Sequence, residues 1–536
     1  MSRGPDPDTA VGTSNGGGAS RPWSSLAAIC AAAGLVWLAF ADLGVAIPTI
    51  ADEFDADLGA LQWANNAFSL VAGALVIAAG RFGDLFGRRL ILQVGILVFA
   101  ACSIVAAVAP GVEVLILGRG LMGVGAALIL PATLALIPIE FTGAAQLTAF
   151  GIWQAVAWGG QAIGPAIGGV LTDSIGWRWL FWLNLPIAVA AIAVNHAFTV
   201  ESRDPDASRR IDWAGLSTIA LAVFALLFAL TDGPSVGWSD PLILGLLAAA
   251  VALAGVWVII ERRVSDPLVD LALFRLRPYD GALTANLSMN LAFGGLSYLL
   301  VLWLQNARGY DAVEAGLLML PSTLGIFVFI PLGGRLDQRR GAKVPVVTGL
   351  FVLAAGCATL GFLTDASTML LLAGALVVIG VGLGLLSTPV SNTAVGDVPT
   401  ELAGAAAGLF KMSSMVGGAL GVAVLSALAR GFTGQGGEAA ARAAGLTPSE
   451  ISQTQDALVG SSTFDETLSK LPGELASKVS DASIDAFTTG VAHTMVATAA
   501  IVAVAGLTVI LLWPSSSGST STANVPTISN PGRSES

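Results

Sequence analysis

The sequence predicts an all-α integral membrane protein with fourteen transmembrane helices, in which two helices are inserted between two six-helix bundles. Apolar residues make up 55% of the chain, charged residues only 11%, and the mean hydropathy is +0.79. A soluble protein of 536 residues needs far more charge to cover its surface. Apolar stretches of about twenty residues recur, and each is long enough to cross a hydrocarbon core of roughly 30 Å.

The predicted spans follow one another along most of the chain. The first six lie near 26–50, 63–80, 90–109, 112–137, 147–171 and 179–200. Two more lie near 213–231 and 241–260, and the last six lie near 281–304, 313–333, 344–363, 367–389, 405–428 and 490–513. The ends, 1–23 and 514–536, are rich in small and polar residues, so we expect both to be disordered, and the first has no signal-peptide core.

Positive charges gather in alternate loops, as expected of cytoplasmic loops. With a cytoplasmic N-terminus, the cytoplasmic loops hold Arg81, Arg88, Arg89, Arg203, Arg209, Arg210, Arg262, Arg263, Arg275, Arg277, Arg335, Arg339, Arg340 and Lys343. The short outer loops hold only Arg178 and Arg308. Removing one helix would destroy this alternation. The charges therefore support fourteen spans in the cell membrane, with both termini in the cytoplasm.

An internal repeat divides the spans. Gly80-Arg81-Phe82-Gly83-Asp84-Leu85-Phe86-Gly87-Arg88-Arg89 follows the second span, and Gly333-Gly334-Arg335-Leu336-Asp337-Gln338-Arg339-Arg340-Gly341 follows the tenth. Repeated halves around a central cavity are a common transporter plan. We predict a six-helix bundle over 24–200, a linker with the two inserted helices over 201–279, and a second six-helix bundle over 280–513.

One long outer segment, 430–489, links the last two spans. Thr447 and Pro448 have the pattern of a helix start, which predicts a small, partly helical element. Two interpretations of it stay open, a lid over the transport path and an element without a role in transport.

These motifs resemble the major facilitator superfamily, and specifically its fourteen-helix multidrug–proton antiporter branch. The resemblance implies a cytoplasmic gate that latches the outward-facing state. Its predicted residues are Gly80, Gly83, Asp84, Gly87, Arg88, Arg89, Gly334, Arg335, Asp337, Arg339 and Arg340. The alternative is a simple positive-inside stop signal.

A second motif supports the same branch. The run from Gly160 to Gly169 resembles the antiporter signature of drug exporters, with Gly160, Gly164, Pro165, Gly168 and Gly169 as its predicted residues. Proline removes a backbone hydrogen bond and bends the helix, and small residues permit close helix contact. The contact could seal the bundle or allow the halves to rock.

Proton coupling is predicted for Asp42 and Arg119. Arg119 begins a motif similar to the family's in the fourth span, with Met122 where the family usually has glutamine. Members of the family usually have an aspartate in the first span at the position that Ala39 occupies here, and Asp42 lies about one turn away.

Asp42 is the one acid that we place deep in a span. Burial and a nearby cation shift a carboxyl in opposite directions, so it could titrate during transport. The alternatives are a fixed Asp–Arg pair and an arginine that is only a structural donor.

The thirteenth span departs from the family at Lys411, where asparagine is usual, and at Ser414 and Met415, where an Arg-Gln pair is usual. A lysine at this depth either extends to the cytoplasmic surface or faces the cavity. A cavity lysine would favour anionic or zwitterionic substrates. The predicted cavity residues are Asn65, Asn66, Trp153, Gln154, Trp158, Gln161, Asn286, Asn290, Tyr298 and Lys411. Many polar groups in membrane helices instead join helices together.

The predicted function is secondary active transport, as a proton-coupled exporter of amphipathic small molecules. Export of an endogenous lipid or secondary metabolite and a non-transporting receptor are the alternatives. We predict no enzyme activity, no metal and no cofactor, because the two histidines are far apart and HExxH, GxSxG and P-loop motifs are absent from the sequence. The net charge of −11 argues against nucleic-acid binding. The expected partners are substrate, protons and membrane lipids, and the expected state is a monomer.

Overall fold

In the computed structural model, helices joined by short connections make up the residues that it describes, which are 21–56, 58–203, 212–264, 267–269, 271–364, 368–444 and 473–513. Predictions for residues 1–20 and 514–536, for Arg209 and Arg210, and for a helix start at Thr447 lie outside these residues.

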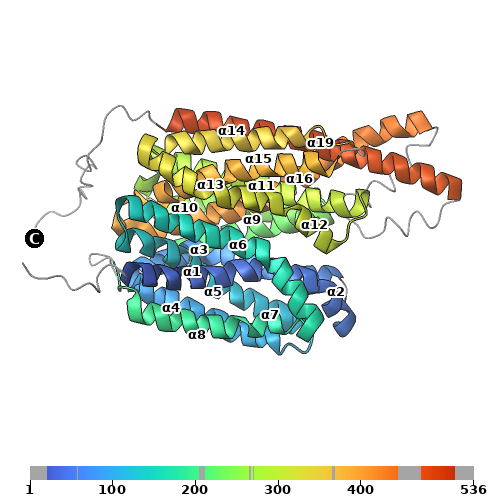
Figure 1. Ribbon diagram of the computed structural model, residues 1–536. Coiled ribbons are helices and arrows are strands. Elements are labelled where there is room, and N and C mark those ends of the chain that lie inside the picture. Colours follow the sequence, from blue (N-terminus) through green and yellow to red (C-terminus); the bar gives the residue numbers. More distant parts are fainter. Residues whose placement is uncertain are drawn as a thin grey trace, which may run out of the picture.

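The first eight helices run back and forth along one direction and form one side of the molecule (Figure 1). They are α1 (Arg21–Ala41), α2 (Leu43–Phe54), α3 (Leu58–Phe86), α4 (Arg88–Ala107), α5 (Val112–Glu140), α6 (Gly143–Ile175), α7 (Trp179–Trp182) and α8 (Asn184–Phe198). Within this group α5 packs against α3 and α4, and α1 packs against α6 and α8.

The later helices form the other side, with α9 and α10 near the middle (Figure 1). They are α9 (Trp213–Val236), α10 (Pro241–Glu261), η1 (Leu271–Arg275), α11 (Arg277–Leu302), η2 (Trp303–Ala307), α12 (Ala312–Leu318), α13 (Leu320–Arg340), α14 (Lys343–Leu360), α15 (Met369–Ser391), η3 (Asn392–Gly396), η4 (Thr400–Leu402), α16 (Ala403–Ala444) and α19 (Gly473–Leu512). Here α15 packs against α13 and α14, and α16 packs against α11 and α19.

Two seams join the groups. In the first, α3 packs against α16, and α9 packs against both of them. In the second, α6 packs against α13 and α15. The start of α1 and the end of α19 lie at the same end of the bundle, and the extended ends of α16 and α19 project past the other helices at the opposite end (Figure 1).

The first span is interrupted at Asp42, which separates α1 from α2. Pro48 inside α2 cannot donate a backbone hydrogen bond and so weakens the helix beyond the interruption. The turns η2 and η3 are π-helical and extend α11 and α15. Such widened turns occur often at functional positions in helices.

Thirteen helical stretches within the described residues are long and apolar enough to cross a membrane. The 33-residue α6 is not one of them, although it is about 50 Å long. The residues Gln154 and Gln161 and the many glycines of α6 lower its hydropathy. Polar and small residues are tolerated here because α6 faces other helices on several sides.

The last two spans are longer than predicted, because α16 has 42 residues and α19 has 40. They extend over 430–444 and 473–489, so the described parts of the outer segment continue the spans as helix.

Candidate functional site

A cavity of about 990 Å³ lies between the two groups of helices, in the half of the bundle away from the start of α1. Its walls are Trp37, Phe40, Ile47, Ala60, Gln62, Trp63, Asn65, Asn66, Ser69, Leu70, Leu227, Leu230, Thr231, Asp232, Pro234, Val236, Asn290, Tyr298, Ser414, Met415, Gly418, Ala419, Val422 and Arg430. Aromatic rings, a thioether and side-chain amides together suit an amphipathic ligand of drug size.

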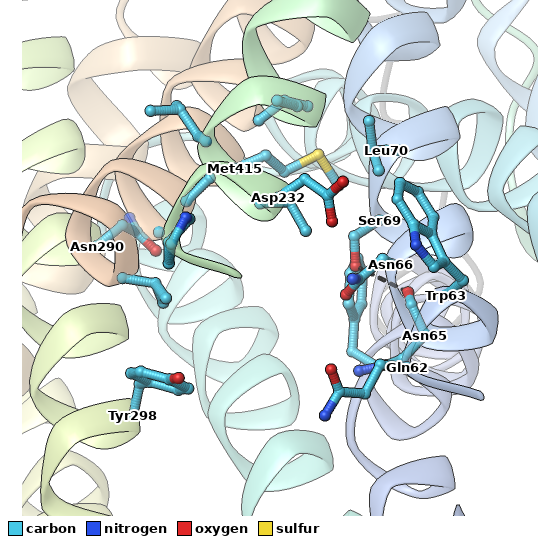
Figure 2. A pocket seen from close by; sticks show the side chains of 18 of the residues that line it. Gln62, Trp63, Asn65, Asn66, Ser69, Leu70, Asp232, Asn290, Tyr298 and Met415 are labelled. Atoms are coloured by element: carbon cyan, nitrogen blue, oxygen red, sulfur yellow. Dashed lines mark hydrogen bonds between the residues drawn. The ribbon is translucent and has the colours of Figure 1, made fainter. Parts of the chain in front are cut away.

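Four predicted cavity residues line this space. Asn65 and Asn66 of α3 face it from one side, and Asn290 and Tyr298 of α11 face it from the other (Figure 2). Asn65 and Asn290 are also tied to the scaffold: Asn65 Oδ1 accepts from Arg119 at 2.9 Å, and Asn290 Nδ2 donates to the Asn286 carbonyl at 2.8 Å. Their amides are therefore positioned before any ligand binds.

One acid in the cavity wall was not predicted from the sequence. Asp232 of α9 directs its carboxylate into the space between α3 and α11 (Figure 2). The seventh span was placed to end at residue 231, but α9 continues to Val236, beyond Pro234. Among the described residues, Asp42 is therefore not the only acid within these helices, because Asp232 lies inside α9, and Asp84 and Glu261 are buried near the ends of α3 and α10, each just beyond the predicted span. The polar run Thr231-Asp232 on an apolar helix was the signal available in the sequence.

Trp153, Gln154 and Trp158 do not line the cavity. Gln154 Nε2 donates to the Ser387 carbonyl at 3.1 Å, and Trp158 Nε1 donates to Ser387 Oγ at 3.3 Å. These two bonds join α6 to α15 across the second seam. Trp153 is fully buried and donates to Thr133 Oγ1 of α5 at 3.2 Å.

Asn286 and Gln161 also lie outside the cavity wall. Asn286 Nδ2 donates to the Phe410 carbonyl, Ser413 Oγ and Ser414 Oγ at 2.7–2.8 Å, so this amide joins α11 to α16. Gln161 is half-buried on α6.

Lys411 takes neither of the two predicted orientations. Its ammonium lies 4.5 Å from the ring centre of Trp153 and 5.1 Å from those of Trp37 and Phe410. The side chain is only 4% exposed, so it does not extend to the surface, and it is not among the cavity-lining residues. Cation–π attraction holds the charge behind Trp37, which itself lines the cavity.

Arg119 is fully buried and binds three acceptors. Its guanidinium donates to the carbonyls of Ala64 and Ala39 at 3.2 and 2.9 Å and to Asn65 Oδ1 at 2.9 Å. It also lies 4.5 Å over the ring of Phe68. Arg119 thus joins α5 to the last turn of α1 and to a cavity amide of α3.

Asp42 is 4% exposed and lies at the break directly after α1. Among the described residues it forms no ion pair with Arg119. The signature glycines of α6 pack on this segment. A Cβ atom at Gly164 would lie 2.6 Å from Ala41 Cβ, and one at Gly168 would lie 2.4 Å from the Asp42 carbonyl oxygen.

The rest of the signature follows the same face of α6. Gly160 meets Trp37 of α1, Gly169 makes ordinary contact with Val45, and Pro165 lies inside the helix. The close approach of α6 to α1 therefore extends along the break at Asp42.

A network of hydrogen bonds closes the other end of the first seam. Asp84 at the end of α3 accepts from Arg88 at 2.7 Å and from the backbone N–H groups of Gly404 and Ala405 at 3.1 and 3.0 Å. Gly404 and Ala405 lie in the first turn of α16, where backbone N–H groups have no partner within the helix. Asp84 therefore acts as the N-terminal cap of a helix in the opposite group. Arg88 also donates to the Thr400 carbonyl.

Glycines allow the two helices of this closure to touch. A Cβ atom at Gly80 would lie 2.2 Å from the Gly404 carbonyl oxygen, whereas one at Gly83 would make only ordinary contact with Arg88. Gly87 has a φ of 115°, which favours glycine, and starts α4. Arg89 of α4 donates to the carbonyl of His196 at 2.8 Å, within its own group.

Comparison with known proteins decides the family. The sequence model of the Major Facilitator Superfamily matches residues 25–422. The chain belongs to this superfamily. It is 35% identical over 387 residues to the multidrug resistance protein Stp of Mycobacterium tuberculosis, covering 72% of each chain. The motif-based prediction of the superfamily is confirmed.

Two other relatives of the chain are also resistance proteins. The tetracenomycin C resistance and export protein of Streptomyces glaucescens is 32% identical over 423 residues, covering 79% of each chain. The quinolone resistance protein NorB of Staphylococcus aureus is 31% identical over 395 residues, covering 73% of this chain and 85% of NorB.

A solved structure supports the fold. The human organic anion transporter MFSD10 (TETRAN) superposes with a TM-score of 0.57 at 14% identity, over 90% of this chain and 99% of that one. The chain is therefore a multi-pass membrane protein with the fold of major facilitator transporters.

The second copy of the superfamily's loop motif lies at the second seam but differs in detail. Arg335, Arg339 and Arg340 are exposed, and none of them forms an ion pair among the described residues. Gly333 touches the Leu385 carbonyl of α15, and Gly334 makes ordinary contact with Thr388.

Asp337, the acid of this second copy, does not cap a helix in the described structure as Asp84 does. Within the described residues, the buried Asp337 Oδ2 has no hydrogen-bond partner. The seam is closed instead by amides, with Gln146 of α6 donating to Asn392 at 2.7 Å and Asn392 donating to Asp397 at 3.3 Å. Loss of surrounding water raises the pKa of Asp397 to about 6.

Proposed function

We propose that this protein exports amphipathic small molecules from the cell in exchange for protons, by alternating access of one central cavity. The observation that carries the proposal is a cavity of about 990 Å³ between two helix groups that are latched together at one end by Asp84. Such an arrangement can present the cavity to only one side of a membrane at a time. The resistance and export named in three relatives supports outward transport of drugs or similar metabolites.

The proposed topology has fourteen spans, with α6 as the fifth. It packs against α1 in one group and against α13 and α15 in the other, so it lies within the bundle. Residues 24–200 and 280–513 are then two six-helix bundles, and 201–279 supplies α9 and α10. The latched end carries Arg88, Arg89 and the arginines in the last turns of α13, which supports a cytoplasmic location for that end and for both termini.

We assign proton coupling to Asp42, with Arg119 as its positioning partner. Arg119 binds the carbonyl of Ala39, one turn before Asp42, and the cavity amide of Asn65. Ligand contact with Asn65 can therefore shift Arg119 relative to Asp42 through two hydrogen bonds. The glycine face of α6 packs on the same segment, so rocking of α6 would also change the surroundings of Asp42.

The proposal is tested in liposomes that contain the purified protein and an internal pH dye. An imposed proton gradient should drive uptake of a lipophilic drug such as ethidium, and drug movement should move protons the other way. Asp42→Asn should abolish both fluxes while the protein still folds and binds the drug. Drug movement with no counter-flow of protons would contradict antiport, and wild-type exchange in Asp42→Asn would contradict the assignment to Asp42.

A further inference from the structure

The inserted helix α9 forms part of the cavity wall. Its contribution consists of Leu227, Leu230, Thr231, Asp232, Pro234 and Val236. The helix is held on both sides of the first seam: Phe228 lies 4.9 Å from Trp63 of α3 between ring centres, and Arg430 of α16 donates to the Pro234 carbonyl at 2.6 Å. On the α3 side, Leu227 comes so close to Gly73 that a Cβ atom there would lie 2.4 Å from it. The segment inserted between the bundles therefore shapes the space in which a ligand binds.

The described cavity wall contains two charged side chains, which lie on different helices. Among the lining residues that the structure describes, Asp232 is the one acid and Arg430 is the one base. Arg430 is exposed and donates to the Pro234 carbonyl, and the half-buried Asp232 directs its carboxylate into the cavity (Figure 2). A carboxylate is costly within a membrane span and acts strongly where water is scarce.

The neighbours of Asp232 complete a site for an organic cation. Trp63 of α3 also lines the cavity and packs its ring against Phe228, one turn before Asp232 on α9, and the amides of Gln62, Asn65 and Asn66 follow along α3 (Figure 2). The face of an indole ring attracts cations, and its surface contacts apolar groups. Lys411, a buried cation of α16, has its ammonium over the rings of Trp37 and Trp153 and is not among the cavity-lining residues.

We propose that Asp232 recognises the cationic group of the ligand, so that the inserted helix α9 sets a preference for amphipathic cations. This inference rests on the proposed function, because it takes the cavity as the substrate site. The aromatic rings of α1 and α3 bind the apolar part of the ligand, and Asp232 supplies the counter-charge.

Tetraphenylphosphonium and tetraphenylborate test this inference, because the two ions have nearly the same shape and opposite charge. Their affinities are measured for the purified full-length protein by equilibrium dialysis. We expect the wild type to prefer tetraphenylphosphonium, and Asp232→Asn to lower that affinity about tenfold by loss of one nearby charge, without lowering the affinity for tetraphenylborate. Asp232→Glu should retain most of the preference.

Asp52→Asn is the matched control, since Asp52 is an exposed acid at the same end of the bundle and outside the cavity wall. Unchanged tetraphenylphosphonium affinity in Asp232→Asn, or an equal loss in Asp52→Asn, would overturn the assignment and leave the proposed function standing. A wild type that binds neither ion would contradict the cavity as a substrate site, and with it the proposed function.

Discussion

Arg119 and Lys411 are cations buried inside membrane helices, and their partners differ in kind. Arg119 is held by two backbone carbonyls and one amide, a set that its planar group of donors can bind simultaneously. Lys411 is held by the faces of Trp37, Trp153 and Phe410. A single ammonium suits a cage of rings, and a guanidinium suits several acceptors in different directions. The residue type at each position thus follows from the geometry of its partners.

A third charged contact lies in the first group of helices, at the end away from Asp84. Glu53 accepts from Trp177 Nε1 at 2.7 Å and from Arg178 at 2.6 Å, and Arg178 lies 4.3 Å over the Trp177 ring. The hydrogen bond from Trp177 and the charge of Arg178 hold the pKa of Glu53 below its usual value. The contact therefore joins the end of α2 to the turn before α7.

This contact should make stability depend on pH in acid. A carboxyl with a lowered pKa in the folded state stabilises the protein above its unfolded pKa, about 4.3, and loses that contribution as the pH falls through the folded value. We expect the melting temperature to fall below about pH 4 less steeply in Glu53→Gln than in the wild type. The difference will be small because both side chains are exposed by more than a third. Parallel curves for the two proteins would contradict this role.

At the scale of the helix, the glycines of α6 act by their spacing. Gly160, Gly164 and Gly168 recur every four residues and so share one face, which packs on the end of α1. Gly169 lies beside this face and only contacts Val45 Cγ1, at 3.6 Å. The two neighbouring glycines therefore differ in what an added methyl group would meet.

Gly168→Ala should impair both stability and transport. Its Cβ atom would lie 2.4 Å from the Asp42 carbonyl oxygen, so α6 must move away from the break in the first span. We expect a loss of about 1–3 kcal/mol in stability and a strong loss of proton-driven exchange. Gly169→Ala, the matched control, should retain the melting temperature and the transport rate. Equal behaviour of the two variants in liposome transport would show that the close contact is not required.

The motif glycines make close helix contacts, as the sequence suggested, whereas the observed cavity wall differs from the predicted one, and the gate role of the loop motif stays a prediction. A soluble helix reveals its buried face by apolar periodicity, but a membrane helix is apolar toward lipid and toward its neighbours alike. Gln154 and Trp158 therefore gave the same signal as Asn65 and Asn66, although the first pair binds Ser387 and the second lines the cavity. Asp232 was missed for a related reason, since hydropathy placed the end of its helix too early.

For the molecule as a whole, the two seams are closed by different chemistry. At the first seam a buried carboxylate caps the start of α16 across the groups, and at the second seam the amides of Gln146 and Asn392 meet. A buried charge that binds backbone donors of another helix is strongly destabilised when the helices separate. Opening of the latched end therefore depends chiefly on how firmly Asp84 is held.

Asp84→Asn should shift the protein toward the state open at the latched end. Removing the charge leaves Arg88 buried without its partner, which costs about 3–5 kcal/mol, enough to lower a closed-to-open ratio of about 100:1 to below 1:1. Spin labels at the exposed residues Phe86 and Glu401, with Cys30, Cys102 and Cys357 replaced, would report the distance across the seam. We expect a second population at longer distance in Asp84→Asn.

The control is Arg335→Gln, which changes a charge in the repeated motif at an exposed side chain and should keep the wild-type distance distribution. A single short distance in both variants would mean that the glycine contacts between α3 and α16 hold the end closed without the carboxylate.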